Sequence, residues 1–143
     1  MDNKDIWWFL NLAKKGFIMP IEEFRATTAI NIKFESDNEF TMFYRGEGLK
    51  LTDKTNVENI ELRVSKEELH FPSLLSFTIS GRCITFKDIK GKFSFLEIVD
   101  YPRGHSLNDV TTYATKSDDH GVRLGFSFAE TDPGCLARVV IRR

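Results

Sequence analysis

Cysteine is scarce in this sequence of 143 residues, and its scarcity limits the redox chemistry that the chain can support. The only two cysteines, Cys83 and Cys135, are far apart and lack the C-x-x-C spacing of a redox or zinc motif. A disulfide framework in a short secreted chain uses more cysteines than this. Each is followed by an apolar residue, and a free cysteine in such a setting behaves as a small hydrophobic side chain. The sequence therefore predicts two reduced, structural cysteines.

Long hydrophobic runs are also lacking. The apolar stretch from Ile6 to Ala13 is interrupted by Asn11 and follows two aspartates, whereas a signal peptide begins with a cationic leader. No apolar run approaches the roughly 20 residues that a membrane-spanning helix requires. We therefore expect a cytoplasmic protein that does not associate with a membrane.

The chain has no strong excess of either charge. It carries 20 basic and 21 acidic side chains, whereas proteins that rely on bulk charge to bind nucleic acid carry a basic surplus. Nucleic acid is therefore not the expected partner. The acidic residues are nevertheless unevenly distributed, and four of them cluster within eleven positions: Glu58, Glu61, Glu67 and Glu68.

The N-terminal segment predicts an α-helix over about residues 3–15. Asp2 is the expected N-cap and Gly16 the expected C-terminal stop. Trp7 and Trp8 lie outside the expected buried face, so the helix is more apolar than one half-buried face requires. We expect either that strands and a loop cover both sides of the helix or that the two tryptophans meet a partner. The residues with the spacing of one buried face are Ile6, Phe9, Leu10, Ala13 and Phe17.

From about residue 26 to residue 142 the pattern changes to the alternation of half-buried strands. Ile60, Leu62 and Val64, for example, alternate with polar residues. Ser65 resembles the first residue of a capping box and predicts one helical turn. Strands are also expected over residues 28–34, 82–86 and 93–99, and a terminal hairpin is expected to turn at residues 132–134.

No long helices separate these strands, so the sheet should be antiparallel rather than parallel. The expected fold class is mainly β (α+β), an antiparallel β-sandwich or partly open barrel of about eight or nine short strands with an N-terminal α-helix. The chain contains no linker, repeat or low-complexity segment. Residues 1–143 should therefore form a single domain.

The sequence offers little material for catalysis. None of its three histidines, His70, His105 and His120, is paired at the i, i+3 or i, i+4 spacing of a zinc site. There is no G-x-S-x-G nucleophile motif, and the segment 46–48 (Gly-Glu-Gly) lacks the other parts of a phosphate-binding loop. We therefore predict no catalytic residue, metal or cofactor. One enzymatic alternative remains, a nuclease or hydrolase that uses His105 and His120 as base and acid.

Three classes of ligand suit a β domain without a catalytic site. A protein partner could meet the acidic cluster and the tryptophan edge of the helix. A small apolar ligand could fill a cavity that the helix closes and that phenylalanines line, namely Phe86, Phe93, Phe95, Phe126 and Phe128. Single-stranded nucleic acid could bind aromatic and cationic side chains of the C-terminal part, namely Tyr113, Phe126, Arg123, Arg138, Arg142 and Arg143.

We favour a non-enzymatic protein-binding domain whose interface includes the acidic cluster and the two tryptophans. In size, charge pattern and lack of catalytic motifs, the chain is similar in general character to the small bacterial immunity proteins that neutralise toxic nucleases. That resemblance implies a basic toxin domain as the partner. No residue is carried over from the family, because no motif of this sequence matches it.

Overall fold

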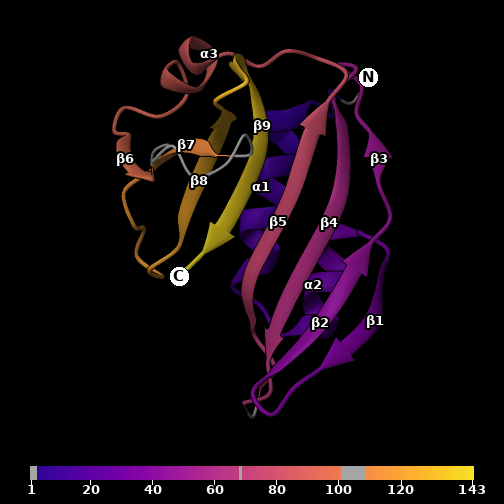
Figure 1. Ribbon diagram of the computed structural model, residues 1–143. Helices are drawn as coiled ribbons and strands as arrows, with labels where there is room; N and C mark the ends of the chain where they lie inside the picture. Colours follow the sequence, from indigo (N-terminus) through magenta and orange to yellow (C-terminus); the bar gives the residue numbers. More distant parts are fainter. Residues whose placement is uncertain (1–2, 68, 101–108) are drawn as a thin grey trace.

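A single antiparallel sheet forms the body of the protein (Figure 1). The computed structural model describes residues 3–67, 69–100 and 109–143. Within these ranges the strands are Ile32–Asp37 (β1), Thr41–Gly46 (β2), Leu49–Lys50 (β3), Asn56–Ser65 (β4), Pro72–Ser80 (β5), Glu97–Asp100 (β6), Val110–Ala114 (β7), Arg123–Ala129 (β8) and Asp132–Arg142 (β9). Their order is β1-β2-β4-β5-β9-β8-β7-β6, and β3 pairs with β4 beside this path. The predicted fold class is confirmed, and the sheet is not closed into a barrel.

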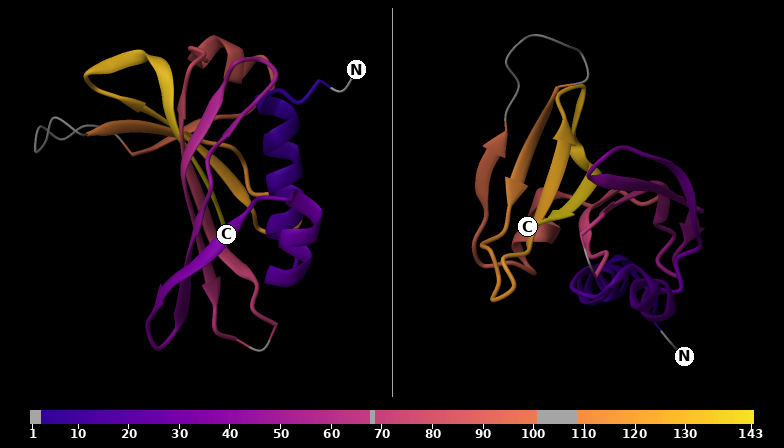
Figure 2. Two further views of the ribbon diagram at one scale, coloured as in Figure 1. Left: turned by 90° about the vertical axis from the view of Figure 1, so that its right-hand side faces the viewer. Right: turned by 90° about the horizontal axis from the view of Figure 1, so that it is seen from below.

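Three helices accompany the sheet in the described part of the chain: α1 (Ile6–Phe17), α2 (Ile21–Thr28) and α3 (Phe86–Lys90). Figure 2 shows α1 and α2 side by side on one face of the sheet. The N-terminal position of α1 agrees with the sequence prediction, although the helix begins and ends slightly later than expected. Within the described ranges, no helix is long and apolar enough to cross a membrane.

The ends of α1 differ from those that the sequence predicted. Asp5 is the N-cap and accepts a hydrogen bond from the backbone N–H of Trp8 at 2.9 Å, whereas the expected cap, Asp2, lies outside the described residues. The helix also continues beyond Gly16. A Cβ atom at this glycine would be 2.6 Å from Cγ2 of Thr28 in α2. Gly16 therefore allows the two helices to pack closely rather than ending the first one.

Only residues 32–34 of the strand predicted over residues 28–34 are in a strand. Helix α2 extends to Thr28, whose hydroxyl donates to the carbonyl oxygen of Phe24 at 2.8 Å. Ala29 then ends the helix in the left-handed conformation, with a φ of 55°, and β1 begins only at Ile32. Tertiary packing of the helix therefore overrides the strand preference of this apolar, β-branched segment.

The strand predicted over residues 82–86 does not form: residues 82–85 are irregular, and helix α3 begins at Phe86. Thr85 is its N-cap, and Thr85 and Asp88 form a capping box in which each side chain accepts a hydrogen bond from the other's backbone N–H. Strand β4 continues to Ser65, the first residue of the other expected capping box, and the Ser65 hydroxyl accepts a hydrogen bond from the backbone N–H of Glu67 at 3.1 Å. Glu68, the other half of that box, lies outside the described residues. The backbone N–H of Ser65 donates to the carbonyl oxygen of Phe71 at 3.0 Å, which draws the chain into the β4–β5 connection.

Two boundaries near the C-terminus also differ from the prediction. Strand β6 begins at Glu97 rather than at residue 93, and the terminal hairpin turns at residues 130–131 rather than at 132–134. Pro133 lies inside β9, where the β8–β9 register is irregular. A proline is tolerated at such a place because no ladder hydrogen bond requires its missing N–H.

The two cysteines form a disulfide, which contradicts the prediction that they are reduced. The Cα atoms of Cys83 and Cys135 are 4.9 Å apart, and the bridge joins the segment before α3 to the start of β9. Beside it, the backbone N–H of Leu136 donates to the carbonyl oxygen of Ile84 at 2.7 Å. The sequence could not reveal this contact, because the fold brings together two segments that are 52 positions apart.

The hydrophobic core lies between the helices and one face of the sheet, which we call the inner face. Phe9 of α1 packs against Phe77 of β5, with ring centroids 5.2 Å apart. On the same face, Phe86 of α3 contacts Phe128 of β8 at 6.3 Å. The opposite face, the outer face, carries no helix in the described part of the chain (Figure 2). Side chains of the outer face are therefore the ones that the fold leaves open to a partner.

Candidate functional site

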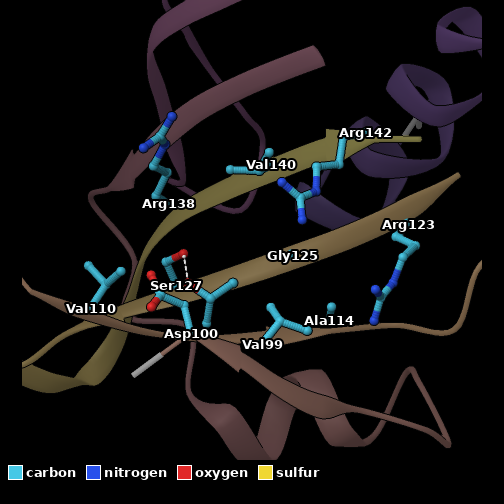
Figure 3. Close-up of a pocket in the computed structure, with 11 residues that line it drawn as sticks. Val99, Asp100, Val110, Ala114, Arg123, Gly125, Ser127, Arg138, Val140 and Arg142 are labelled. Atoms are coloured by element: carbon cyan, nitrogen blue, oxygen red, sulfur yellow. Dashed lines mark hydrogen bonds between the residues drawn. The ribbon is translucent and has the colours of Figure 1, made fainter. Parts of the chain in front are cut away.

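The outer face is hollowed over the C-terminal strands β6 to β9, and this hollow is the candidate functional site (Figure 3). Its volume is about 310 Å³. The lining combines basic, hydroxyl and small apolar side chains, among them Arg123, Arg138, Arg142, Ser127, Gly125 and Val140. We refer to it as the arginine groove.

Strand alternation places the three arginines in this groove. In β9 the side chains of Val139 and Ile141 are fully buried in the core. Their neighbours Arg138 and Arg142 therefore point to the outer face. Arg123 of β8 lies directly opposite Arg142 in the antiparallel register, so the same face receives all three guanidinium groups.

The three arginines differ in how their charge is balanced. Arg123 forms an ion pair with Glu97 of β6, and its Nε donates to the carbonyl oxygen of Thr115 at 3.0 Å. Arg138 and Arg142 form no hydrogen bond or ion pair with any described residue. The groove therefore holds one arginine fixed by the protein and two that are available to a ligand.

Small residues form the floor of the arginine groove. Gly125 of β8 lies between Val140 of β9 and Ala114 of β7. Beside it, the hydroxyl groups of Thr112 and Ser127 hydrogen bond to each other at 2.7 Å. A glycine inside a strand often marks a place where a ligand approaches the backbone, and here its missing side chain leaves the middle of the floor open.

The predicted acidic cluster is only partly gathered on one surface. Glu58 and Glu61 lie on the outer face of β4, two strands away from β9. Glu58 accepts a hydrogen bond from the hydroxyl of a serine in β5, and Glu61 lies 3.6 Å from Arg63 in an ion pair. Glu67 is exposed in the connection between β4 and β5, while Glu68 lies outside the described residues. The outer face therefore presents at least two of the four glutamates.

Trp7 and Trp8, the other predicted contact residues, lie on α1 and so on the inner side of the sheet. Trp7 packs against the core, with Nζ of Lys92 5.6 Å from the centre of its ring. Trp8 is 36% exposed, and Nζ of Lys4 lies 5.6 Å from its ring centre. The fold therefore does not bring the tryptophans together with the glutamates of β4.

The residues suggested for nucleic-acid binding separate between the two faces of the sheet. Three of the arginines share the groove, but Arg143 instead donates to the carbonyl oxygen of Pro72 at 2.9 Å. Tyr113 and Phe126 contact other aromatic rings on the inner face. Among the described residues that line the groove there is consequently no aromatic ring on which a base could stack.

The phenylalanines suggested for a ligand cavity pack mainly against one another. The rings of Phe86 and Phe128 are 6.3 Å apart, and those of Phe93 and Phe126 are 5.4 Å apart. Phe95 is instead 47% exposed. Four of the five phenylalanines thus belong to the core or its margin.

The turn before β8 contains Asp118 and His120, and hydrogen bonds and an ion pair of Asp118 stabilise it. Asp118 accepts hydrogen bonds from the backbone N–H groups of Val122 and His120, and pairs with Lys14 at 3.3 Å. Burial raises the pKa of Asp118, but these contacts outweigh burial and hold the pKa below its ordinary value. His105, the suggested catalytic partner of His120, lies outside the described residues. Across the described ranges, no three metal-binding side chains lie close enough to hold an ion.

Sequence reasoning missed Gly125 and Val140 as parts of the site. The alternation of Leu124 and Phe126 was the available signal, because it places the residue between them on the opposite face. No protein-family model, curated protein or solved structure matches this chain. The side chains of the outer face are therefore the basis for a functional proposal.

Proposed function

We propose that the chain is a non-enzymatic protein-binding domain whose partner contacts the outer face of the sheet. The observation that supports this most directly is the charge on that face. Arg138 and Arg142 of β9 have no bonded partner among the described residues, and Glu58 and Glu61 lie two strands away on β4. Because neighbouring strands are about 4.8 Å apart, the two sets of charges are separated by about 10 Å, within reach of one partner.

Charges of both signs on one open face favour a protein over a nucleic acid as the partner. The phosphates of a nucleic acid would be attracted by the arginines of β9 but repelled by Glu58 and Glu61. A protein surface can present the opposite charge at each position. Such complementarity speeds association and rejects partners with the wrong charge pattern.

More specifically, we propose that the partner is a bacterial toxin of the nuclease type and that this chain is its immunity protein. A nuclease carries a basic surface for its substrate, and Glu58 and Glu61 are suited to contact such a surface. An inhibitor of this kind acts by covering the toxin, so it requires neither a cofactor nor a catalytic residue.

A cytoplasmic location belongs to the same hypothesis, and the disulfide provides its test. Reducing systems in the cytoplasm keep most protein thiols free, so the Cys83–Cys135 bridge favours an oxidising compartment. Cells can be quenched in acid and their free thiols alkylated before the protein is isolated. Alkylated cysteines would support the cytoplasm, whereas protected cysteines would contradict it.

A calorimetric titration of the full chain with the protein encoded by the adjacent gene tests the proposed function. Replacing Glu58→Lys and Glu61→Lys together should weaken binding about 10-fold or more, because attraction is replaced by repulsion. The matched control, Glu22→Lys with Glu23→Lys, reverses two exposed charges on α2, on the other side of the sheet, and should change the affinity less than about twofold.

Two results would contradict the proposal. Equal losses in the β4 and α2 variants would mean that the glutamates of β4 are not part of a specific interface. An adjacent gene product that does not bind, or whose toxicity the chain does not relieve, would overturn the toxin partnership. Circular dichroism of each variant checks that the fold is intact.

A further inference from the structure

Arg138 and Arg142 are exceptions among the arginines of this protein. Every other described arginine bonds to a carboxylate or a carbonyl oxygen, namely Arg25, Arg45, Arg63, Arg82, Arg123 and Arg143. Arg138 and Arg142 have no such partner in the described ranges, although they line the same groove. Guanidinium groups bond most strongly to oxyanions, to which they can donate two parallel hydrogen bonds. The groove therefore has two unused groups for binding an anion.

The position of Arg142 gives a second, independent reason to expect an anion. Arg142 lies directly opposite Arg123, and like charges that face each other across an antiparallel pair destabilise the sheet. Glu97 balances Arg123, so the unbalanced charge remains at Arg142. An anion from a ligand would remove this repulsion. The register thus leaves Arg142 as the cation whose charge a bound anion would balance.

The open floor of the groove gives such an anion room beside Arg142. In Figure 3 the side chain of Arg142 extends from β9 towards Gly125 of β8. The residues opposite Gly125 on the neighbouring strands are Val140 and Ala114, and the side-chain atom nearest to a Cβ at Gly125 would be Cγ2 of Thr112 at 3.3 Å. A ligand can therefore place its anionic group over the glycine and its apolar atoms on the valine.

The charge of the groove selects among oxyanions. Glu97 balances Arg123, and Arg138 and Arg142 each carry one positive charge at separate ends of the groove (Figure 3). A phosphate monoester carries a charge of about −1.5 to −2 at neutral pH, more than one guanidinium group balances. A carboxylate carries a single negative charge. The balance therefore favours a carboxylate over a phosphate.

We infer that the arginine groove binds an acidic side chain of the partner protein, with the carboxylate paired to Arg142. This inference rests on the proposed protein-binding function and names the chemical group that the groove recognises. Val140 and Val99 contact the apolar part of the acidic side chain and the chain beside it. Arg138, at the other end of the groove, attracts further acidic groups of the same segment.

A peptide titration of the full chain tests this inference. The probe is a fluorescein-labelled decapeptide of alternating valine and glutamate, and its reference is the same peptide with glutamine in place of glutamate. The acidic peptide should bind with a Kd below about 1 mM, and Arg142→Gln should weaken this binding about 10- to 100-fold. The matched control is Arg45→Gln, which removes an exposed arginine of β2 that is already paired with Glu35 and should leave the affinity within about twofold.

Thermal unfolding provides a second measurement on the same proteins. A saturating amount of the acidic peptide should raise the Tm of the wild type and of Arg45→Gln but not that of Arg142→Gln, because only a bound ligand stabilises the folded state. The glutamine peptide should raise none of them. Arg142 is exposed, so its replacement by glutamine should not prevent folding.

Several outcomes would overturn the inference. One is equal binding of the glutamate and glutamine peptides, and another is an equal loss in both arginine variants. Displacement of the peptide by inorganic phosphate at lower concentration than by acetate would identify a phosphate site, and tighter binding of a single-stranded oligothymidine would identify a nucleic-acid site. Failure of the wild type to bind the peptide would also reject the inference. The protein-binding function would stand if Glu58→Lys with Glu61→Lys still weakened partner binding.

Discussion

Opening the Cys83–Cys135 disulfide should lower the free energy of unfolding by about 4 kcal/mol at 25 °C. The bridge closes a segment whose ends are 52 positions apart. In the chain-entropy treatment, a cross-link of this length removes about 14 cal/mol/K from the unfolded ensemble, which corresponds to that free energy. A domain of this size is stable by only about 5–15 kcal/mol, so the bridge supplies a large part of the total.

The native fold should nevertheless survive without the bridge. The backbone N–H of Leu136 donates to the carbonyl oxygen of Ile84 at 2.7 Å, and both side chains are buried in the core. These contacts hold the two bridged segments next to each other without a covalent bond. The loss of stability should therefore come mainly from a freer unfolded chain rather than from a distorted native state.

Urea unfolding of three samples measures this effect: the oxidised protein, the same protein after reduction, and the double variant Cys83→Ser/Cys135→Ser. The second and third should lose similar free energies of unfolding. Each single serine variant is a control, because it breaks the same bond and should cost about as much as the pair. An unchanged midpoint after reduction, or two reactive thiols in unfolded protein that has seen no reductant, would refute the reasoning.

Two further predictions concern residues near the disulfide and the first helix. Gly81 and Gly121 both have positive φ angles, of 84° and 75°. A Cβ atom at Gly81 would lie 2.3 Å from the carbonyl oxygen of Lys54, whereas a Cβ atom at Gly121 would have no atom within 4 Å. In thermal unfolding, Gly81→Ala should therefore lose about 1–3 kcal/mol more than Gly121→Ala, and equal losses would mean that the close approach is unimportant. Burial raises the pKa of Asp53, but hydrogen bonds from Thr55, the N–H of Ile6 and Arg82 outweigh it and hold the pKa below 3.8. The stability that Asp53 contributes is complete above pH 3.8 and is lost as the pH falls through the lower folded-state pKa. The urea midpoint of Asp53→Asn should therefore fall less steeply in acid than the midpoint of the wild type.

The fold class was predictable because one face of most strands is buried. In β4, for example, Ile60, Leu62 and Val64 alternate with polar residues in the sequence, and all three side chains are buried in the structure. Individual elements were less predictable where one local signal fits two structures. Ser65 and Thr85 each begin a capping-box pattern, but among the described residues only Thr85 starts a helix. The difference lies in the tertiary hydrogen bonds of the β4–β5 connection, which the local sequence does not contain.

The candidate site was predictable in composition but not in geometry. Arg138 and Arg142 belonged to the arginine group that the sequence singled out, yet so did Arg143, which bonds to the carbonyl oxygens of Pro72 and Phe17. Neighbouring residues of a strand point to opposite faces. To predict which of these arginines line the groove, one therefore has to know at which residue β9 ends. The facing pair of Arg123 and Arg142 depends on the hairpin register, and that register in turn depends on a turn that the sequence placed two residues too late.

The order of the strands explains why both sets of charges on the outer face remain available to a partner. Strand β5 lies between β4, which carries Glu58 and Glu61, and β9, which carries Arg138 and Arg142. No residue of β5 is charged, and its outer face carries Leu74 together with the hydroxyl side chains of Ser76, Thr78 and Ser80. An ion pair can span two strand spacings in this sheet, as the pair of Arg123 in β8 and Glu97 in β6 does. Glu58 and Glu61 bond instead to Ser80 and Arg63, and Arg138 and Arg142 pair with neither glutamate. An uncharged central strand thus keeps an acidic and a basic surface side by side, and a partner that binds both must cross β5.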